Sequence, residues 1–325
     1  MPVIGYHASH EQFSPSALKA LVTRAEASGF HSAMSSDHFH PWSEGQGQSG
    51  FAWAWLGSAL EATRLNFGII TAPGWRYHPA IIAQAVGTLL EMYPDRLWLA
   101  LGSGEAINEH MTGLPWPEKD ERNARLLECV QIIRALFAGE TVMHRGRVIA
   151  IECKLYTRPH QAPLILGAAV TPETAGWVAT WADGLITVSA KPPKLKATLD
   201  AFRKNGGEGK PVFLKAGLSW AATERAAVNQ AHEQWRSNAI GGELSWLLRT
   251  PGDFDQASRL IRPEDMHESV LISADLGQHA DWLAEYIDMG VEQIYLHNVG
   301  RNQEQFIDAF GKKVLPSLAK PGDQN

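Results

Sequence analysis

The sequence predicts an α/β fold, specifically a (β/α)8 TIM barrel with insertions at its rim. Short apolar runs alternate with helical patterns, and each unit takes roughly thirty residues. This alternation is typical of parallel strands joined by right-handed crossovers. The chain has 325 residues, of which 45% are hydrophobic. That length suits one barrel with insertions, although two smaller domains would fit it equally well.

The first half of the chain follows the alternation without interruption. Ser14 and Pro15 predict the start of a helix, because serine caps helices and proline is favoured in the first turn. Gly29 predicts its end. The expected strands are residues 3–6, 32–36, 65–71 and 97–101, and the expected helices are residues 14–28, 53–63, 79–92 and 119–137.

The second half carries two insertions. A turn at Arg145 and Gly146 between two strand-like runs predicts a small hairpin on the barrel rim. Residues 240–261 have no clean period, and we expect them to cover the mouth of the barrel. The remaining expected strands are 164–168, 184–187, 212–221 and 293–297, and the expected helices are 172–181, 196–204, 223–236, a short one from 263, 278–289 and 303–315, which Pro316 would stop.

We therefore expect one barrel domain over residues 1–318, with insertions near 139–160 and 238–263 and a flexible tail over 319–325. Charged residues make up 20% of the chain and the formal net charge is −6. Neither value favours nucleic acid or an anionic membrane as a partner. No apolar run is long enough to span a bilayer, and no signal-peptide pattern opens the chain. Cys129 and Cys153 lie far apart, so a reduced, cytoplasmic setting is expected.

Two polar loops follow expected strands. The first is Ser36-Asp37-His38-Phe39-His40-Pro41-Trp42, and the second runs from Gly102 to Glu109 through Glu105 and Asn108. Barrel enzymes keep their catalytic residues on such loops, so we expect the two loops to share one pocket. Imidazole accepts a proton near neutral pH, and a carboxyl group could act opposite it.

A zinc site is an alternative reading of the first loop. Asp37, His38 and His40 are residue types that ligate zinc. No further cluster of ligands accompanies them in the sequence. We therefore expect no metal site.

Several motifs resemble those of the luciferase-like flavin and deazaflavin oxidoreductases. The matching segments are Gly5 to Ser9 with Glu11-Gln12-Phe13, Ser36 to Trp42, Arg76 to Pro79 with Ala83-Gln84, and Gly102 to Glu109. The resemblance is specific from Val3 to Arg147 and weaker over 184–191 and 290–297. By motif the chain is most similar to the F420-dependent glucose-6-phosphate dehydrogenases and to a sister branch of non-F420 flavin oxidoreductases. The fold of that family is an eight-stranded barrel with insertions.

The resemblance implies a hydride-transferring oxidoreductase with FMN or coenzyme F420 and a small organic substrate. It implies that His38 acts as a base, or stabilises the transfer state, at the substrate C–H bond, and that Glu105 is the opposing acid. Trp42 would stack beside the substrate and the ring. The implied cofactor contacts are Asp37, Ile70, Thr71, Gly104, Glu105, Asn108, Gly167 and Ala168, and the implied substrate contacts are His40, Trp42, Lys191 and Trp246.

Each implied role has a simpler structural alternative. His38 could only bond a loop backbone, Asp37 and Asn108 could be caps, and Trp42 could be an ordinary core residue. The backbone amide groups after Gly104 could also meet a phosphate or a ring carbonyl at a helix start. The family often carries a non-proline cis peptide bond at the strand end covered by residues 69–72.

Departures from the family pattern concern the cofactor tail and the substrate. Ala168 and Ala169 fall where the dehydrogenases have a double glycine, which would crowd the approach of a phosphate to the backbone. Val188 replaces a threonine, and Gln256 falls near a phosphate-binding lysine. A phosphate dianion would lose most of its charge partners, so glucose 6-phosphate is not expected as the substrate.

The alternatives to a hydride-transferring oxidoreductase are an FMNH2-dependent monooxygenase and a non-catalytic flavin-binding protein. Relatives are commonly dimers, so we expect a homodimer.

Overall fold

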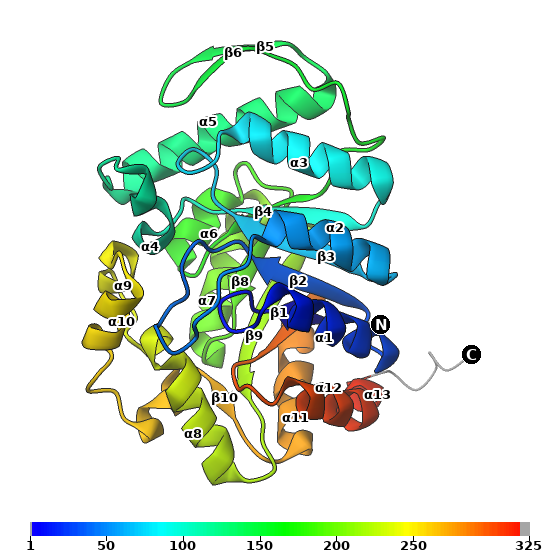
Figure 1. Cartoon of the computed structure of the whole chain (residues 1–325), viewed down its shortest axis with the longest axis vertical. Coiled ribbons are helices and arrows are strands. Elements are labelled where there is room, and N and C mark those ends of the chain that lie inside the picture. Colours follow the sequence, from blue (N-terminus) through cyan, green and yellow to red (C-terminus); the bar gives the residue numbers. More distant parts are fainter. Residues whose placement is uncertain (1, 319–325) are drawn as a thin grey trace.

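A closed ring of parallel strands forms the centre of the computed structural model, which describes residues 2–318 (Figure 1). Strand β1 pairs with β2 on one side and with β11 on the other, and this second pairing closes the ring. The eight strands in ring order are β1 (Val3–Ala8), β2 (Ser32–Ser36), β3 (Asn66–Thr71), β4 (Leu97–Leu101), β7 (Ile165–Ala168), β8 (Gly184–Val188), β9 (Val212–Ser219) and β11 (Gln293–Asn298). This arrangement confirms the predicted (β/α)8 barrel.

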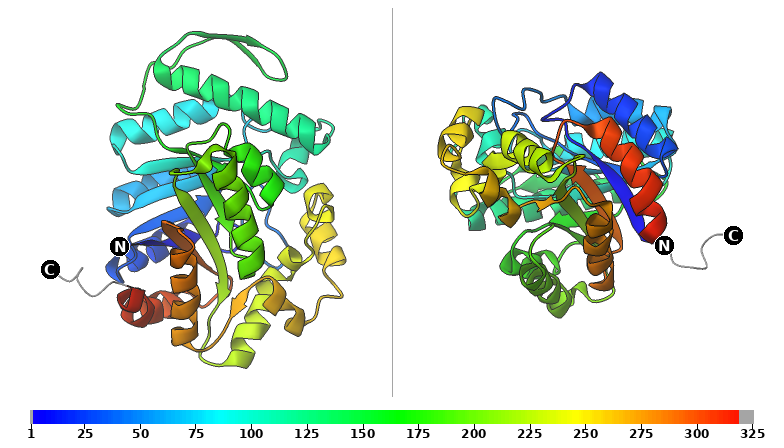
Figure 2. Two further views of the ribbon diagram at one scale, coloured as in Figure 1. Left: turned by 180° about the vertical axis from the view of Figure 1, so that it is seen from behind. Right: turned by 90° about the horizontal axis from the view of Figure 1, so that it is seen from below.

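Helices surround the ring, as the two further views in Figure 2 show. They are α1 (Pro15–Ala27), α2 (Ala52–Ala62), α3 (Pro79–Met92), α5 (Lys119–Ala138), α6 (Pro172–Val178), α7 (Pro192–Phe202), α8 (Glu224–Trp235), α11 (Leu276–Asp288) and α12 (Gln303–Ala309). The Ser14 hydroxyl accepts a hydrogen bond from the Ala17 amide and caps α1, as its sequence predicted. Helix α7 begins four residues earlier than expected, because prolines fill its first turn.

Two segments lie outside the barrel repeat. Strands β5 (Val142–Arg145) and β6 (Ile149–Cys153) form an antiparallel hairpin. Short helices α9 (Leu244–Leu247) and α10 (Pro251–Ala257) occupy the second insertion, followed by a 3-10 helix at Pro263–Glu268. The sequence pattern did not predict β10 (Leu271–Ile272), which pairs with β9. The expected flexible tail, residues 319–325, lies outside the described residues.

The predicted stop at Pro316 is wrong. After α12 the helical chain continues through a π-helical turn, Phe310–Val314, into α13 (Leu315–Leu318). Pro316 lies near the start of α13. This helix directly follows the π-helical turn, where the regular i→i−4 hydrogen bonding of an α-helix is already interrupted.

Large side chains fill the inside of the barrel. The interior cluster contains Met34, Trp98, Ala100, Leu166, Ile186, Phe213 and Tyr295. Gly68 leaves room for Trp98, because a Cβ atom there would lie 1.8 Å from its Cζ2 atom. Side chains of a strand alternate between its two faces, so the residue two places further along each strand forms the next interior layer. No helix within residues 2–318 has both the length and the apolar character needed to cross a membrane.

Candidate active site

The two polar loops of the sequence meet at the carboxyl ends of the strands. One loop follows β2, and the other follows β4 and leads into α4 (Ala106–Glu109). Helix α4 is only one turn long and continues as a 3-10 turn, His110–Thr112. Gly104 adopts a φ of 88°, and a Cβ atom there would lie 3.1 Å from Glu109 Cγ. Glycine therefore allows the loop to fold back tightly onto α4.

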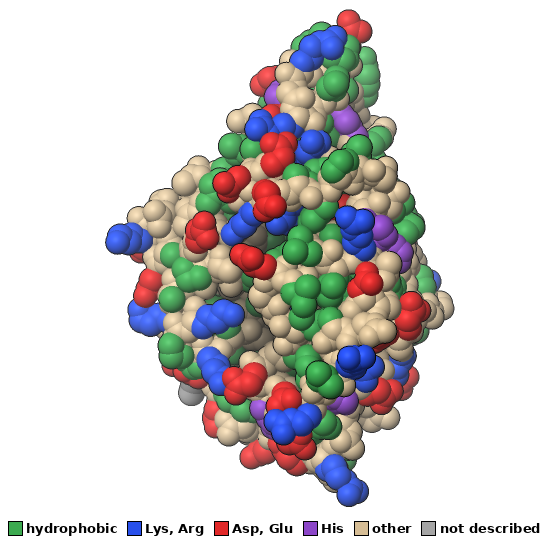
Figure 3. Space-filling view, turned by 90° about the vertical axis from the view of Figure 1, so that its left-hand side faces the viewer, with side chains coloured by type: hydrophobic (Ala, Val, Ile, Leu, Met, Phe, Trp, Pro, Cys, Tyr) green, Lys and Arg blue, Asp and Glu red, His purple; other side chains and the backbone are tan. Residues whose placement is uncertain are grey.

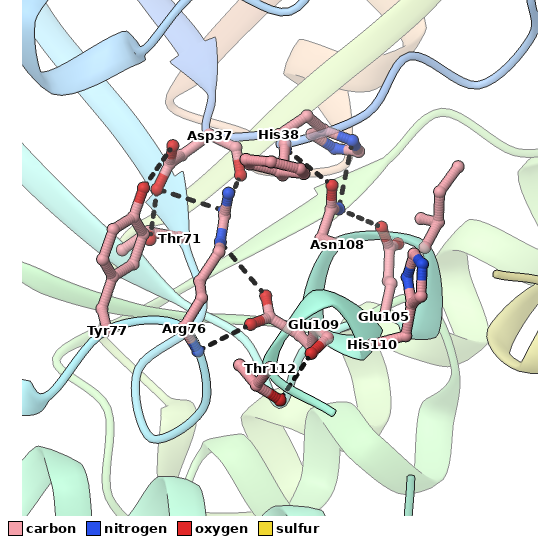
Figure 4. Close-up of polar contacts among 12 residues, drawn as sticks. Asp37, His38, Thr71, Arg76, Tyr77, Glu105, Asn108, Glu109, His110 and Thr112 are labelled. Carbon is pink, nitrogen blue, oxygen red and sulfur yellow. Dashed lines mark hydrogen bonds and ion pairs between the residues drawn. The ribbon is translucent and has the colours of Figure 1, made fainter. Parts of the chain in front are cut away.

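His38 and Glu105 lie on either side of Asn108 (Figure 4). The Asn108 Nδ2 atom is 3.2 Å from His38 Nδ1 and 3.4 Å from Glu105 Oε2. The Trp42 and His38 rings are 4.9 Å apart between centroids. The structure thus brings together the three residues expected to be catalytic.

Glu11 lies on the other side of His38. Its Oε1 atom is 3.5 Å from His38 Nε2, and its Oε2 atom accepts a hydrogen bond of 2.9 Å from the Ser9 hydroxyl. The Glu11 side chain is only 3% exposed. The sequence marked Glu11 as part of a family motif, but not as a site residue. Glu11 lies in the loop that follows β1. The same signal, a polar residue just after a strand, identified the other two loops.

A second polar network surrounds Asp37. Its carboxylate accepts hydrogen bonds from the Thr71 hydroxyl at 2.8 Å and the Tyr77 hydroxyl at 3.2 Å. The Arg76 guanidinium lies between two acids, 3.3 Å from Asp37 and 3.5 Å from Glu109. Asp37 and Thr71, both expected at the cofactor, therefore have partners within the protein.

Burial sets the direction of the pKa shifts in both networks. It raises the pKa of Glu109 to about 7, and the nearby Arg76 opposes this shift. It also raises the pKa of Glu105, against the opposing charges of His38 and Lys215. A buried carboxyl group with a raised pKa holds its proton more readily near neutral pH.

The upper interior layer of the barrel forms the floor beneath these loops. It is apolar on one side, with Ile70 and Ala168, and polar on the other, with Lys215 and His297. The Lys215 ammonium lies 5.4 Å from the centre of the Trp235 ring. Burial lowers the pKa of Lys215, whereas Glu11 and Glu105 oppose the shift. Lys215 was missed in the sequence, where its only signal is a charge at an inward position of an apolar strand.

Two strand ends bear on the expected cofactor contacts. A Cβ atom at Gly167 would lie 2.3 Å from Val178 Cγ1, so this glycine makes room for α6 rather than facing the barrel interior. The peptide bonds of the described residues contain no cis bond, so the expectation of one within 69–72 is wrong.

The residues expected at the substrate lie around the rim. His40 donates from Nδ1 to the Ile107 carbonyl at 2.8 Å, which ties it to α4. Trp246 lies on α9, and its carbonyl accepts a hydrogen bond of 3.0 Å from the Trp116 indole. The Lys191 ammonium pairs with Glu268 at 2.5 Å, and both side chains are mostly exposed.

The donor set around the floor fits a flat heterocycle. Ile70 and Ala168 supply an apolar surface, while His38, Glu105 and Lys215 supply polar groups for its edges. The face of the molecule over the carboxyl ends of the strands is hollowed near its middle, with basic and acidic side chains around the hollow (Figure 3). A separate pocket of about 290 Å³ lies at the opposite end of the barrel, where Asn66, Leu97 and Gln293 begin their strands.

Comparisons with known proteins agree on one family. Residues 2–293 match the family model described as luciferase-like monooxygenase. An F420-dependent glucose-6-phosphate dehydrogenase of Microbacterium testaceum is 34% identical over 97% of each chain. A solved F420-dependent secondary alcohol dehydrogenase, in complex with an F420–acetone adduct, is 28% identical with a TM-score of 0.90 and covers 98% of this chain and 99% of its own. A long-chain alkane monooxygenase, 14% identical with a TM-score of 0.73 over 98% of this chain and 91% of its own, shares the fold.

Replacing Glu109 by glutamine should change how stability depends on pH. The pKa of Glu109 rises from 4.5 to about 7 on folding, so the folded state binds more protons than the unfolded state between these values. The free energy of unfolding of the wild type, minus that of Glu109→Gln, should therefore fall as pH rises from about 4.5 to about 7. The slope cannot exceed about 1.4 kcal/mol per pH unit.

Urea denaturation at a series of pH values measures this difference. Glu173→Gln removes one negative charge from a side chain that is 89% exposed, and serves as the control. If the free energy of unfolding of the wild type minus that of Glu109→Gln stays level or rises with pH, the pKa of Glu109 is not raised on folding.

Proposed function

The chain belongs to the luciferase-like monooxygenase family, and from this premise we propose that it transfers a hydride between coenzyme F420 and a small, uncharged alcohol or carbonyl compound. It is an oxidoreductase that works with a flavin or deazaflavin cofactor. F420 is favoured over FMN because the two compared relatives above 25% identity are both named for F420. The compared relative that is itself named a monooxygenase, at 14% identity, shows the fold alone.

The observation that carries the proposal is the meeting of His38 and Glu105 across Asn108 at the mouth of the barrel. Oxidation of an alcohol moves a hydride from carbon and a proton from oxygen, so the site needs a proton acceptor beside the hydride acceptor. F420, when bound, supplies the hydride acceptor. His38 and Glu11 supply groups that take up or hold a proton on one side, and Glu105 supplies a carboxyl group on the other.

The residues that would hold the cofactor ring are those of the floor and the loop after β4. Ile70 and Ala168 would contact its face, and Gly104 and Glu105 would lie along its edge. Asp37 and Thr71 would support the wall of the pocket through their bonds to each other and to Tyr77. Trp42 would close the pocket over the substrate, beside His38.

The charges around the mouth favour an uncharged substrate. Recognition of a phosphate dianion requires several unpaired cations. Lys191 is paired with Glu268, and Val188 offers no hydroxyl group. The Glu11 carboxylate would repel a dianion that entered more deeply. We therefore infer an alcohol or its carbonyl partner, with Trp246 and His40 at the rim of its entry path.

Replacing His38 by alanine tests the assigned chemistry. The affinity for F420, measured by titration, should remain close to that of the wild type, because His38 would contact the substrate rather than the ring. Turnover should fall by roughly 10²-fold to 10⁴-fold, the usual loss when a general acid or base is removed. His160→Ala, in an exposed loop, is the matched control. Equal activity in His38→Ala would reject the mechanism, and absence of turnover in the wild type with every substrate would favour the non-catalytic alternative.

A comparison of substrates tests the inferred class. With oxidised F420, a secondary alcohol such as 2-propanol should bleach the cofactor absorbance, whereas glucose 6-phosphate should not. Faster bleaching with glucose 6-phosphate would overturn the inference of an uncharged substrate. Oxygen consumption with reduced FMN, but no reaction with F420, would instead support the monooxygenase alternative.

We also propose that the chain forms a homodimer and resides in the cytoplasm, where its unpaired Cys129 and Cys153 would stay reduced. Phe51, Ile81 and Ile149 expose large apolar side chains. The Phe51 ring lies against Tyr77, and the adjacent His78 donates to the Ile149 carbonyl, which brings these three segments together. Such a patch is typical of a subunit interface.

Light scattering during size-exclusion chromatography should give a mass twice that of one chain. Ile81→Glu should reduce it to that of one chain, because a charge would be buried without a partner. Leu260→Glu, at an exposed leucine outside the patch, is the control. A single-chain mass for the wild type would contradict the proposed dimer.

A further inference from the structure

The orientation of the Asn108 side chain is determined by two backbone amides. Its Oδ1 atom accepts hydrogen bonds from the Phe39 amide at 2.9 Å and from the His40 amide at 3.4 Å. A backbone N–H group can only donate, so the atom that faces both amides must be the oxygen. The orientation of this amide therefore follows from the backbone of the loop after β2.

The nitrogen of Asn108 must then face His38 and Glu105. Nδ2 carries hydrogens and no lone pair that accepts, so His38 Nδ1 at 3.2 Å can only be the acceptor. A neutral imidazole has one N–H group, and its proton must therefore be on Nε2. That atom lies 3.5 Å from the Glu11 carboxylate, an acceptor for an N–H group.

All four hydrogen-bonding positions of the Asn108 amide have partners. The oxygen accepts twice, from Phe39 and His40, and the nitrogen donates twice, to His38 and Glu105. Asn108 is 5% exposed. A contact from this side chain to the tail of a cofactor, which the family resemblance implied, would require one of the four bonds to break.

We propose that Asn108 is a positioning residue that keeps the proton of neutral His38 on Nε2, facing Glu11, and holds Glu105 on the same amide. This role rests on the proposed function only for its effect on turnover. The position of the proton is a property of the protein without cofactor or substrate, so it can be measured separately.

Two neighbouring histidines have the opposite arrangement. His40 Nδ1 lies 2.8 Å from the Ile107 carbonyl, and His110 Nδ1 lies 3.0 Å from the Ala106 carbonyl. A carbonyl only accepts, so both rings carry a proton on Nδ1. Their stacked rings are 5.4 Å apart, which places two internal references beside His38.

Nitrogen NMR of the cofactor-free protein with ¹⁵N-labelled histidine distinguishes the two tautomers, because protonated and unprotonated ring nitrogens differ in chemical shift. His38→Gln identifies the His38 signals by their loss. In the wild type, the neutral His38 ring should carry its proton on Nε2, while His40 and His110 carry theirs on Nδ1. A His38 proton on Nδ1 would overturn the proposal without any variant.

Asn108→Asp tests the cause. A carboxylate still accepts from the two backbone amides but cannot donate to His38, so the ring should move its proton to Nδ1 and donate to the new acid. His40 and His110 should keep their tautomers. Turnover with F420 should fall by roughly tenfold or more, because the new carboxylate cannot donate to Glu105 and repels it.

Asn66→Asp, at an exposed position at the other end of the barrel, adds the same charge and should leave His38 unchanged. A His38 Nδ1 atom that stays unprotonated in Asn108→Asp would overturn the role of Asn108, even if turnover fell. A reversed tautomer together with unchanged turnover would leave the structural role intact and reject the effect on catalysis. Failure of the substrate tests alone would reject the proposed function and leave the tautomer result standing.

Discussion

The closure of eight parallel strands into one ring is the constraint on which the site depends. Because all the strands run the same way, every loop that follows a strand emerges at the same end. His38 and Asn108 are 70 residues apart in the sequence, yet their side chains are within hydrogen-bonding distance. Glu11 arrives at the same place from the loop after β1. No local structure could have assembled this group.

The floor of the site follows from the same constraint. Alternation along each strand places large apolar residues such as Trp98 and Tyr295 in the middle of the barrel, where they close it to solvent. The next inward positions include Lys215 and His297. Burial disfavours the charged form of each side chain and lowers its pKa. The hydrophobic filling of the barrel therefore also lowers the effective dielectric constant beneath the reacting groups. Electrostatic interactions between the remaining charges are stronger there as a result.

Two polar networks with different tasks share the mouth. Arg76, between Asp37 and Glu109, ties the loop after β2 to α4, and its charge offsets part of the cost of burying two acids. Asn108 ties the same two segments through neutral hydrogen bonds, and its partners are the groups with acid or base chemistry. One network therefore supports the loops, and the other arranges the groups expected to act on the substrate.

The sequence by itself determined the order of the strands, the barrel and the loops that carry His38 and Glu105, because side-chain periodicity and turn residues are local properties. It also marked the family through contiguous motifs. Only the tertiary structure decided that Gly167 leaves room for α6, that Lys215 lies inside the barrel, and that Pro316 lies within a helical run rather than ending it. Tautomers and pKa shifts belong to this second group, because they depend on which groups folding brings together and on how far it removes them from water.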